Sequence, residues 1–303
     1  MLKSRHFPLL ILLLLLACAA CSISIEAQTN APALRVAVLN FGEKQTGLRA
    51  AEKLALAFSA DKRIALTDRE ESRAAARGAG YAGSLNMTLE EARDLGGAIG
   101  ADFYLTGDAQ TLRRSPSTGP HYFEAYASIF IVSSRTGRLL LWERPSFEAA
   151  SPDKAEAMLL EEVKKRATHY ADMIEKAREM ELSERAQMLE RVSMAAPVIE
   201  DAPDDEAEAA RQGLRLPQPY RRLRPSYPET AARAEAEATV DVQVEIDARG
   251  EVSRVEVVRW AGFGLDEAAV STVRQLHFSP ARRDGLAIPM RVLLRYNFRR
   301  PPK

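Results

Sequence analysis

The chain has 303 residues, enough for two ordinary domains, and its 46% apolar content is normal for folded protein. Its 42 basic and 42 acidic side chains cancel, and a net charge near zero argues against general nucleic-acid binding. Both cysteines, Cys18 and Cys21, lie near the N-terminus, which excludes a disulfide, a thiolate metal site and a catalytic cysteine from the remainder.

Residues 1–27 have the pattern of an export signal. Two basic residues precede an apolar run at 7–20, which is shorter than the roughly 20 residues of a membrane-spanning helix. The four residues that end at Cys18 resemble a bacterial lipoprotein processing site, which predicts lipidation of Cys18. Two alternatives are plain cleavage after Ala27 and an uncleaved anchor. All three place the body of the chain outside the cytoplasm.

Residues 34–150 predict an α/β domain with a mixed sheet. Three apolar stretches, separated by helical patterns, are typical of buried strands and lie at 34–42, 63–67 and 101–107. Asp68 can cap the helix that follows it, and residues 88–91 form a capping-box pattern. A long alternating stretch and a tight turn at 121–142 then predict a hairpin. Strands that alternate with helices before a hairpin favour a mixed sheet.

Residues 151–193 predict one long helix, because the pattern continues after Pro152 without Gly or Pro. Apolar side chains recur over its first half, which we expect to pack on the α/β domain. Alanines and charges dominate the second half, which we interpret as a solvated strut. Residues 194–223 carry prolines, an acidic cluster and then a basic cluster. We interpret them as a charged linker that acts as a solubilising tether, in preference to a charge-specific binding site.

Residues 224–300 predict a small β-β-α-β domain, which makes the whole chain α+β. Apolar and polar residues alternate from Thr239 to Asp247, and a second strand runs from about Val252 to Arg259. A helical repeat follows, with acid in its first turn where the helix dipole favours it. The last alternating stretch, 288–298, contains Pro289 near its start. Proline lacks an N–H and belongs at a sheet edge or a strand start.

No pattern in the sequence supports catalysis, and we predict neither an enzyme nor a cofactor or metal site. The glycine-rich stretch at 78–83 matches a dinucleotide fingerprint, but it follows a helix where that fingerprint needs a strand, so we interpret it as a loop. His121, His169 and His277 lie in separate elements without metal-ligand spacing. The acidic pairs fall on a helix face and in the linker, where they form no positioned acid/base pair.

Residues 224–298 resemble the C-terminal domain of the TonB family. The resemblance rests on the order and spacing of Pro225-x-Tyr227-Pro228, Val240-x-Val242-x-Val244-x-Ile246-Asp247, Leu265-Asp266-x-Ala268-Ala269, Phe278-x-Pro280-Ala281 and Asp284-Gly285. Domains of this family capture the short N-terminal segments of outer-membrane transporters by strand addition. The resemblance implies the same role here, in energy-coupled transport on the periplasmic side of a Gram-negative envelope.

Residues 34–150 resemble the domain shared by curli-secretion lipoproteins, penicillin-binding-protein activator lipoproteins and the N-terminal part of TolB. The matching stretches are Val36-Ala37-Val38-Leu39-x-Phe41, Leu66-Thr67-Asp68-Arg69, Gly100-Ala101-Asp102-x-Tyr104-Leu105-x-Gly107 and Thr136-Gly137-x-x-Leu140-x-Trp142. Such domains serve as envelope scaffolds. This resemblance implies the alternative function, a lipid-anchored scaffold that binds a partner through each domain and transduces no energy.

The last strand is the predicted binding edge. Arg291 and Arg295 point away from its apolar face, a common protection for an exposed edge. If the first strand is central, Asp241 and Glu245 can pair with them, for a gain of roughly 0.2–1 kcal/mol per pair. A free edge can accept an extended peptide, although dimerisation or the C-terminal tail can also close it. We predict partner binding at Ser226, Tyr227, Pro228, Met290, Arg291, Val292, Leu293, Leu294 and Arg295.

Overall fold

The computed structural model describes residues 33–192, 199–203 and 205–300. The described residues from Leu34 onward belong to one compact unit. Cys18 and the predicted export signal therefore lie outside the described residues. Within the described ranges, no helix combines the length and the apolar character that crossing a membrane requires.

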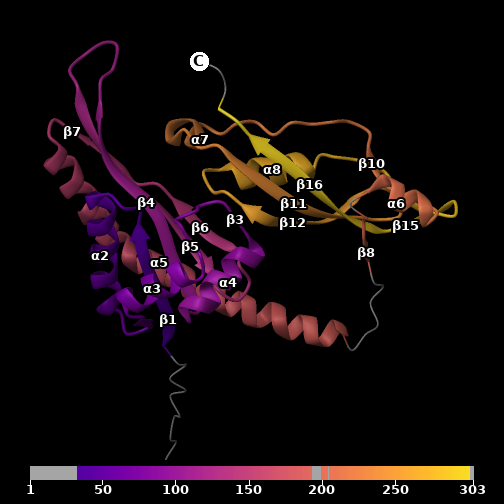
Figure 1. Ribbon diagram of the computed structural model, residues 1–303, viewed down its shortest axis with the longest axis horizontal. Helices are drawn as coiled ribbons and strands as arrows, with labels where there is room; N and C mark the ends of the chain where they lie inside the picture. Colours follow the sequence, from indigo (N-terminus) through magenta and orange to yellow (C-terminus); the bar gives the residue numbers. More distant parts are fainter. Residues whose placement is uncertain (1–32, 193–198, 204, 301–303) are drawn as a thin grey trace, which may run out of the picture. The chain divides into compact units, whose positions relative to one another are not determined.

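The N-terminal part of the compact unit is an α/β domain (Figure 1). Its elements are β1 (Leu34–Phe41), α2 (Gln45–Ser59), β2 (Ile64–Leu66), α3 (Arg69–Gly78), β3 (Met87–Thr88), α4 (Leu89–Ile99), β4 (Phe103–Arg114), β5 (Tyr122–Ser133), β6 (Leu139–Glu143), β7 (Ser146–Ala149) and α5 (Pro152–Val192). The sheet runs β2-β1-β4-β5-β6, and β7 also pairs with β5. The β1 pairings are parallel and those of β5 are antiparallel, so the predicted mixed sheet is confirmed.

Helices bury both faces of this sheet. On one face, side chains of α2 and α5 such as Phe58 and Tyr170 join a cluster with the strand residues Val36 and Leu105. On the other face, α3 and α4 pack on alternate residues of the same strands. Strands buried on both faces have nearly continuous apolar sequence. This explains why the apolar stretches at β1 and β4 predicted strands correctly.

Side-chain caps start two of the helices as predicted. The Asp68 carboxylate accepts a hydrogen bond of 2.8 Å from the Glu71 N–H at the start of α3. At α4, the Thr88 hydroxyl accepts from the Glu91 N–H, and the Glu91 carboxylate accepts from the Thr88 N–H in return. These bonds satisfy N–H groups that the first helical turn leaves without a partner.

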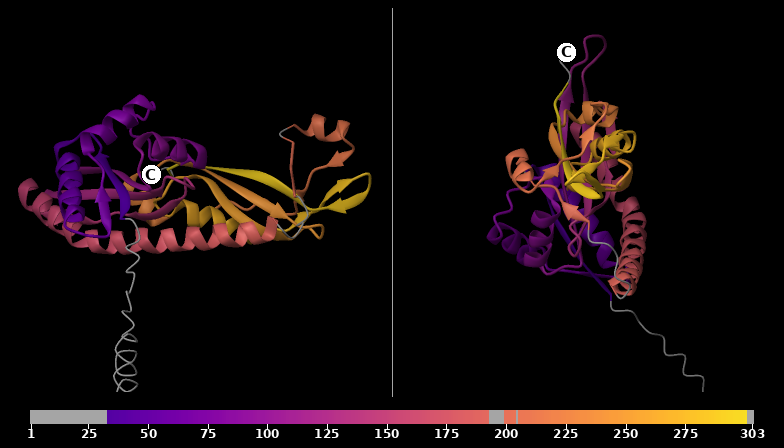
Figure 2. Two further views of the ribbon diagram at one scale, coloured as in Figure 1. Left: turned by 90° about the horizontal axis from the view of Figure 1, so that it is seen from below. Right: turned by 90° about the vertical axis from the view of Figure 1, so that its right-hand side faces the viewer.

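The long helix α5 is continuous (Figure 2) and its two halves differ as expected. Leu159, Val163, Tyr170 and Ile174 are fully buried against the α/β sheet. Residues 182–188 are exposed. Between the halves, Glu181 is nearly buried, and its carboxylate accepts a hydrogen bond from the Arg135 Nε at 3.0 Å.

The C-terminal part contains the predicted β-β-α-β order as β11, β12, α8 and β16. Its elements are β8 (Glu200–Asp201), α6 (Glu206–Arg211), β9 (Leu214–Arg215), β10 (Gln218–Pro219), α7 (Glu229–Ala234), β11 (Ala238–Ile246), β12 (Val252–Trp260), α8 (Leu265–Val273), β13 (Phe278–Ser279), β14 (Ala281–Arg283), β15 (Leu286–Ile288) and β16 (Met290–Phe298). The main sheet runs β3-β12-β11-β16-β8. Alternate residues of β11, from Val240 to Ile246, are buried in a cluster with α8. The strand order places β11 at the centre of this sheet.

The segment that we interpreted as a charged linker is mostly exposed where the structure describes it, but it is also tied to the C-terminal part. Three of its short strands pair with the C-terminal part, β8 with β16, β9 with β14 and β10 with β13. Ala209 and Leu214 are buried in a cluster with Ala281 and Met290. The sequence did not predict these short strands, because a few apolar residues among many charges are enough to anchor them when the neighbouring domain supplies their partners.

Candidate peptide-binding site

The outer edge of β16 is open along most of its length. On its inner side β16 pairs with β11 from Met290 to Phe298. On its outer side, β8 pairs in parallel with only Met290 and Arg291, and the Ala202 N–H donates to the Arg291 carbonyl at 2.7 Å. Among the described residues, no strand pairs with the outer side of β16 from Val292 onward. The expected edge is therefore already occupied at Met290 and Arg291, and open beyond them.

The backbone direction identifies which residues can pair with an added strand. In a strand, the N–H and C=O of one residue point to the same side and successive residues alternate. Because the Arg291 carbonyl points outward to β8, the backbone groups of Leu293, Arg295 and Asn297 also point outward. Those of Val292, Leu294 and Tyr296 point toward β11 and are used there. Leu293 is also 53% exposed.

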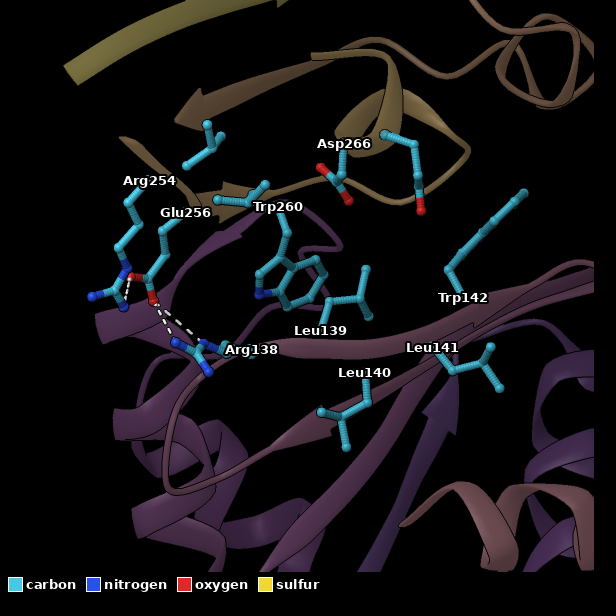
Figure 3. A pocket seen from close by; sticks show the side chains of 12 residues that line it. Arg138, Leu139, Leu140, Leu141, Trp142, Arg254, Glu256, Trp260 and Asp266 are labelled. Atoms are coloured by element: carbon cyan, nitrogen blue, oxygen red, sulfur yellow. Dashed lines mark hydrogen bonds and ion pairs between the residues drawn. The ribbon is translucent and has the colours of Figure 1, made fainter. Parts of the chain in front are cut away.

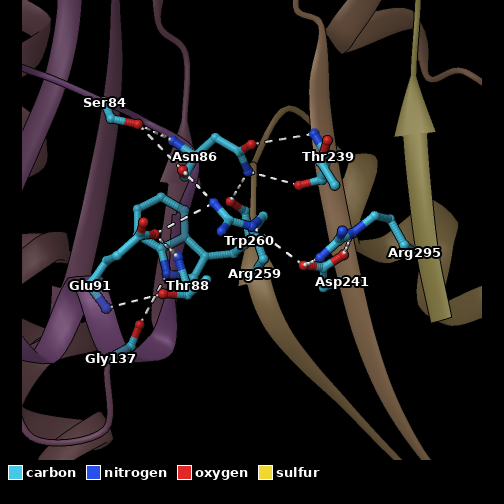
Figure 4. A network of polar contacts seen from close by, with 10 residues as sticks. All are labelled: Ser84, Asn86, Thr88, Glu91, Gly137, Thr239, Asp241, Arg259, Trp260 and Arg295. Carbon is cyan, nitrogen blue, oxygen red and sulfur yellow. Dashed lines mark hydrogen bonds and ion pairs between the residues drawn. The ribbon is translucent and has the colours of Figure 1, made fainter. Parts of the chain in front are cut away.

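Ion pairs draw the arginine side chains of β16 across the sheet, as predicted. Asp241, at the centre of β11, is 4% exposed, and its carboxylate accepts from the Arg295 Nε at 2.7 Å. The Arg259 Nε lies 3.4 Å from the same carboxylate, on its other side (Figure 4). Arg291 pairs with Glu245 at 3.0 Å. The contact with Asp241 draws the Arg295 guanidinium toward β11, whereas the Arg291 guanidinium also reaches Asp201 of β8, at 3.2 Å.

A groove of about 440 Å³ lies beside the C-terminal half of β16. One wall is the segment that leads from β10 to α7, and it includes Arg224 and Tyr227. The other wall is β16 itself, from Arg295 to Phe298, with Arg299 beyond its end. The groove is therefore continuous with the open edge and widens the space available to an added segment.

Of the predicted residues Ser226, Tyr227 and Pro228, only Tyr227 lines this groove. The Tyr227 hydroxyl donates to the Ala236 carbonyl at 2.6 Å, and its ring packs on the core of the C-terminal part. Ser226 is exposed, and Pro228 is the N-cap residue of α7. The Tyr227 hydroxyl hydrogen is used internally, so this side chain offers the groove its half-buried ring and no free donor.

The opposite edge of the sheet is fixed to the α/β domain. Met87 and Thr88 of β3 pair with Trp260 and Arg259 of β12. The Asn86 side chain donates to the Trp260 carbonyl at 2.7 Å and to the Thr239 carbonyl at 2.8 Å (Figure 4). The β12 edge is thus occupied where it meets β3. Sequence analysis missed this junction, because neither Asn86 nor β3 has a local pattern that points to β12.

A second cavity, of about 450 Å³, lies between β6 and β12 (Figure 3). Trp142 and Trp260 line it, and Arg138 pairs with Glu256 at one end. Asp266, from the first turn of α8, also faces it. Within the described part of the chain, no group of three or more His, Cys, Asp and Glu side chains is arranged to hold a metal ion.

Asp266 is a half-buried acid whose pKa is raised. Its carboxylate accepts from the N–H groups of Ala261 and Gly262 at 2.9 and 2.8 Å. Burial nevertheless raises the pKa of Asp266 to about 6, from an unfolded value near 4. A raised folded pKa favours the neutral acid in the fold. Its contribution to stability is complete below pH 4 and is lost as the pH rises through 6.

We therefore expect Asp266→Asn, which stays neutral, to gain stability relative to the wild type as the pH rises. Between pH 4 and pH 7 the difference in free energy of unfolding should shift by about 2–3 kcal/mol in favour of the variant. Urea unfolding at both pH values measures it. Glu179→Gln, at an exposed position on α5, serves as the control and should show no such trend. A shift in the opposite direction for Asp266→Asn contradicts the assignment.

Comparisons with known proteins identify the C-terminal part. Residues 224–299 match the family model described as Gram-negative bacterial TonB protein C-terminal, which confirms the family predicted from the motifs. No curated protein matches the chain. The solution structure of the Pseudomonas aeruginosa TonB C-terminal domain is 19% identical and covers 29% of this chain and 89% of that one, with a TM-score of 0.25.

Two further solved structures are similar to parts of the chain. The hypothetical protein CT253 from Chlamydia trachomatis is 12% identical, covers 46% of this chain and 98% of that one, and has a TM-score of 0.34. The NMR structure of LpoB from E. coli is 13% identical, covers 39% of this chain and 57% of that one, and has a TM-score of 0.27.

Proposed function

We propose that this chain is a periplasmic binding protein of a Gram-negative envelope that captures an extended segment of another envelope protein as an added strand on β16. The observation that carries the proposal is the open outer side of β16 from Val292 to Phe298, where the backbone groups of Leu293, Arg295 and Asn297 lack a strand partner among the described residues. Backbone pairing along a free edge is a recurring mode of peptide recognition.

The family match at residues 224–299 supports a transporter as the partner. We infer that the captured segment belongs to an outer-membrane transporter and that binding serves energy-coupled transport. β3 pairs with β12 only at Arg259 and Trp260. We infer that β16 is the edge on which a strand is added, because its open stretch adjoins the groove. The chemistry of the site is non-covalent recognition, and we assign no catalytic residue.

A specific observation favours a second candidate, a scaffold without energy transduction. The C-terminal sheet is joined to the α/β domain by β3 and by the hydrogen bond from the Trp260 Nε1 to the Gly137 carbonyl, at 3.0 Å. Such a junction suits a protein that holds two partners at fixed separation. Mass spectrometry of the mature N-terminus separates the candidates, because a lipidated Cys18 argues against direct coupling to an inner-membrane motor.

Amide hydrogen exchange of the full chain tests strand addition. On titration with peptides from transporter N-termini, we expect the N–H groups of Leu293, Arg295 and Asn297 to become protected. The N–H groups of Val292, Leu294 and Tyr296 should change little, because they already bond to β11. This alternation is specific to an added strand, and a contact through side chains alone does not produce it.

A matched pair of peptides provides the control. Backbone N-methylation at the positions that face β16 should abolish the protection, while methylation at the intervening positions should preserve it. Protection of the same amides that rises with protein concentration, without peptide, assigns the edge to a second copy of the chain. If no peptide protects Leu293, Arg295 or Asn297, strand capture at β16 is wrong.

A further inference from the structure

We propose that the outer edge of β16 selects acidic extended segments. This inference rests on the proposed function and adds the chemical class of the partner. It concerns the stretch from Leu293 to Arg299, together with the segment around Arg224 that forms the other wall of the groove. Three features of the described residues support it. They are the strand that already occupies part of the edge, the positive charge of the groove, and an arginine on its far wall that forms no ion pair with a described residue.

The first feature is that β8 is itself an acidic segment added to this edge. Both of its residues carry carboxylates, and each one meets an arginine of the C-terminal part. Glu200 pairs with Arg283 at 2.6 Å, and Asp201 pairs with Arg291 at 3.2 Å, while the Ala202 N–H continues the backbone pairing. The chain therefore already combines backbone addition with carboxylate–arginine contacts at the start of β16.

The second feature is the charge of the groove farther along the edge. Arginine is the charged residue type in its lining, at positions 224, 295 and 299, and no acidic side chain lines it. Arg295 and Arg299 are paired on the sheet side with Asp241 and Glu237. A guanidinium has several N–H donors in a fork, so a paired arginine can still donate to a second carboxylate.

The third feature is an unused positive charge on the far wall. Arg224 is exposed and forms no ion pair with a described residue, and the same holds for Arg221 and Arg222 just before it. In the sequence these arginines are indistinguishable from a solubilising cluster. The fold changes their meaning, because it brings Arg224 to the groove beside β16. A strand laid along the edge then lies between Arg224 on one side and Arg295 and Arg299 on the other.

Each carboxylate–arginine contact should raise the affinity for an acidic peptide over a neutral one only slightly, but several contacts together should give a measurable difference. An exposed ion pair contributes little by itself and weakens with salt. Over a strand with three carboxylates the sum corresponds to roughly a tenfold difference in affinity. Backbone pairing supplies the sequence-independent part of the binding, so a neutral peptide should still bind, more weakly.

The test compares two blocked nine-residue peptides of Thr and Val, one with three Glu and one with three Gln at the same positions. We expect the Glu peptide to bind the full chain about tenfold more tightly at low ionic strength, and the ratio to fall toward one at 0.5 M salt. Arg224→Glu should reduce the ratio severalfold. Arg93→Glu, at an exposed position on α4, is the matched control and should leave it unchanged.

The outcomes separate the two proposals. If both peptides bind equally and protect the amides of Leu293, Arg295 and Asn297, strand capture stands and acidic selection is wrong. If the Glu peptide binds without protecting those amides, its charge is recognised elsewhere and the inference about this edge is wrong. If neither peptide binds or protects them, the proposed function fails together with the inference.

Discussion

Trp260→Ala is expected to lower the free energy of unfolding by about 3–5 kcal/mol. The Trp260 side chain is 2% exposed, and its ring centroid lies 5.8 Å from that of Phe130. The substitution removes this packing and also leaves the Gly137 carbonyl without the donor that now lies 3.0 Å away. A cavity and an unsatisfied buried acceptor each add to the cost. Urea unfolding of the full chain measures the change.

The variant also tests the junction between the two parts of the chain. Because Trp260 pairs with Met87, its loss should speed amide exchange in β3 and at the end of β12 more than in β11 or β16. Tyr220→Ala is the control, since Tyr220 is 71% exposed and surface substitutions usually change stability by less than about 0.5 kcal/mol. A loss below about 1 kcal/mol for Trp260→Ala contradicts the assigned role.

Local patterns were sufficient to predict most of the elements and the centre of the C-terminal sheet. The alternation in β11 and β16 defines which residues share a face, so the pairs Asp241–Arg295 and Glu245–Arg291 could be predicted before their distances were known. The caps at Asp68 and Thr88 depend on residues only three positions apart. In each case the physical cause lies within one element or between two strands of one small sheet.

Long-range pairings of short segments could not be predicted. Thr88 begins the predicted capping box, yet Met87 and Thr88 also form the short strand that pairs with the end of β12. The sequence does not reveal the partners of Trp260, because Phe130 and Gly137 lie more than a hundred residues earlier. A two-residue strand has no periodicity of its own, so the fold of its neighbours determines where it pairs.

The same limit applies to charge. An acidic cluster in a sequence is usually solvated, and for this reason we interpreted residues 194–223 as a tether. Glu200 and Asp201 instead meet Arg283 and Arg291. Charge alone does not determine which residues lie opposite each other. The partners of Glu200 and Asp201 are determined by the backbone pairing of β8 with β16. The open part of the predicted binding edge is shorter than expected for the same reason, because β8 already pairs with Met290 and Arg291.

Gly137→Ala is expected to destabilise the chain by about 3 kcal/mol or more. Gly137 has a φ of +71°, which costs an L-residue roughly 1–2 kcal/mol. An added Cβ would also lie 2.0 Å from the Leu89 carbonyl oxygen, a backbone atom that cannot rotate away. Leu89 opens α4 directly after β3, so relief of this clash requires a shift of the turn or of the helix start. Thermal or urea unfolding of the full chain measures the loss.

Gly100→Ala separates the two causes of this loss. Gly100 has nearly the same φ, +73°, but an added Cβ there meets nothing within 4 Å. Its replacement should cost about 1–2 kcal/mol, which is the backbone cost alone. The additional loss of unfolding free energy for Gly137→Ala then measures how closely the turn that accepts the Trp260 hydrogen bond is packed. Because that turn and β3 together fix the β12 end of the sheet, Gly137→Ala should also speed amide exchange at β3, and Gly100→Ala should not. Equal losses for the two variants contradict close packing at this junction.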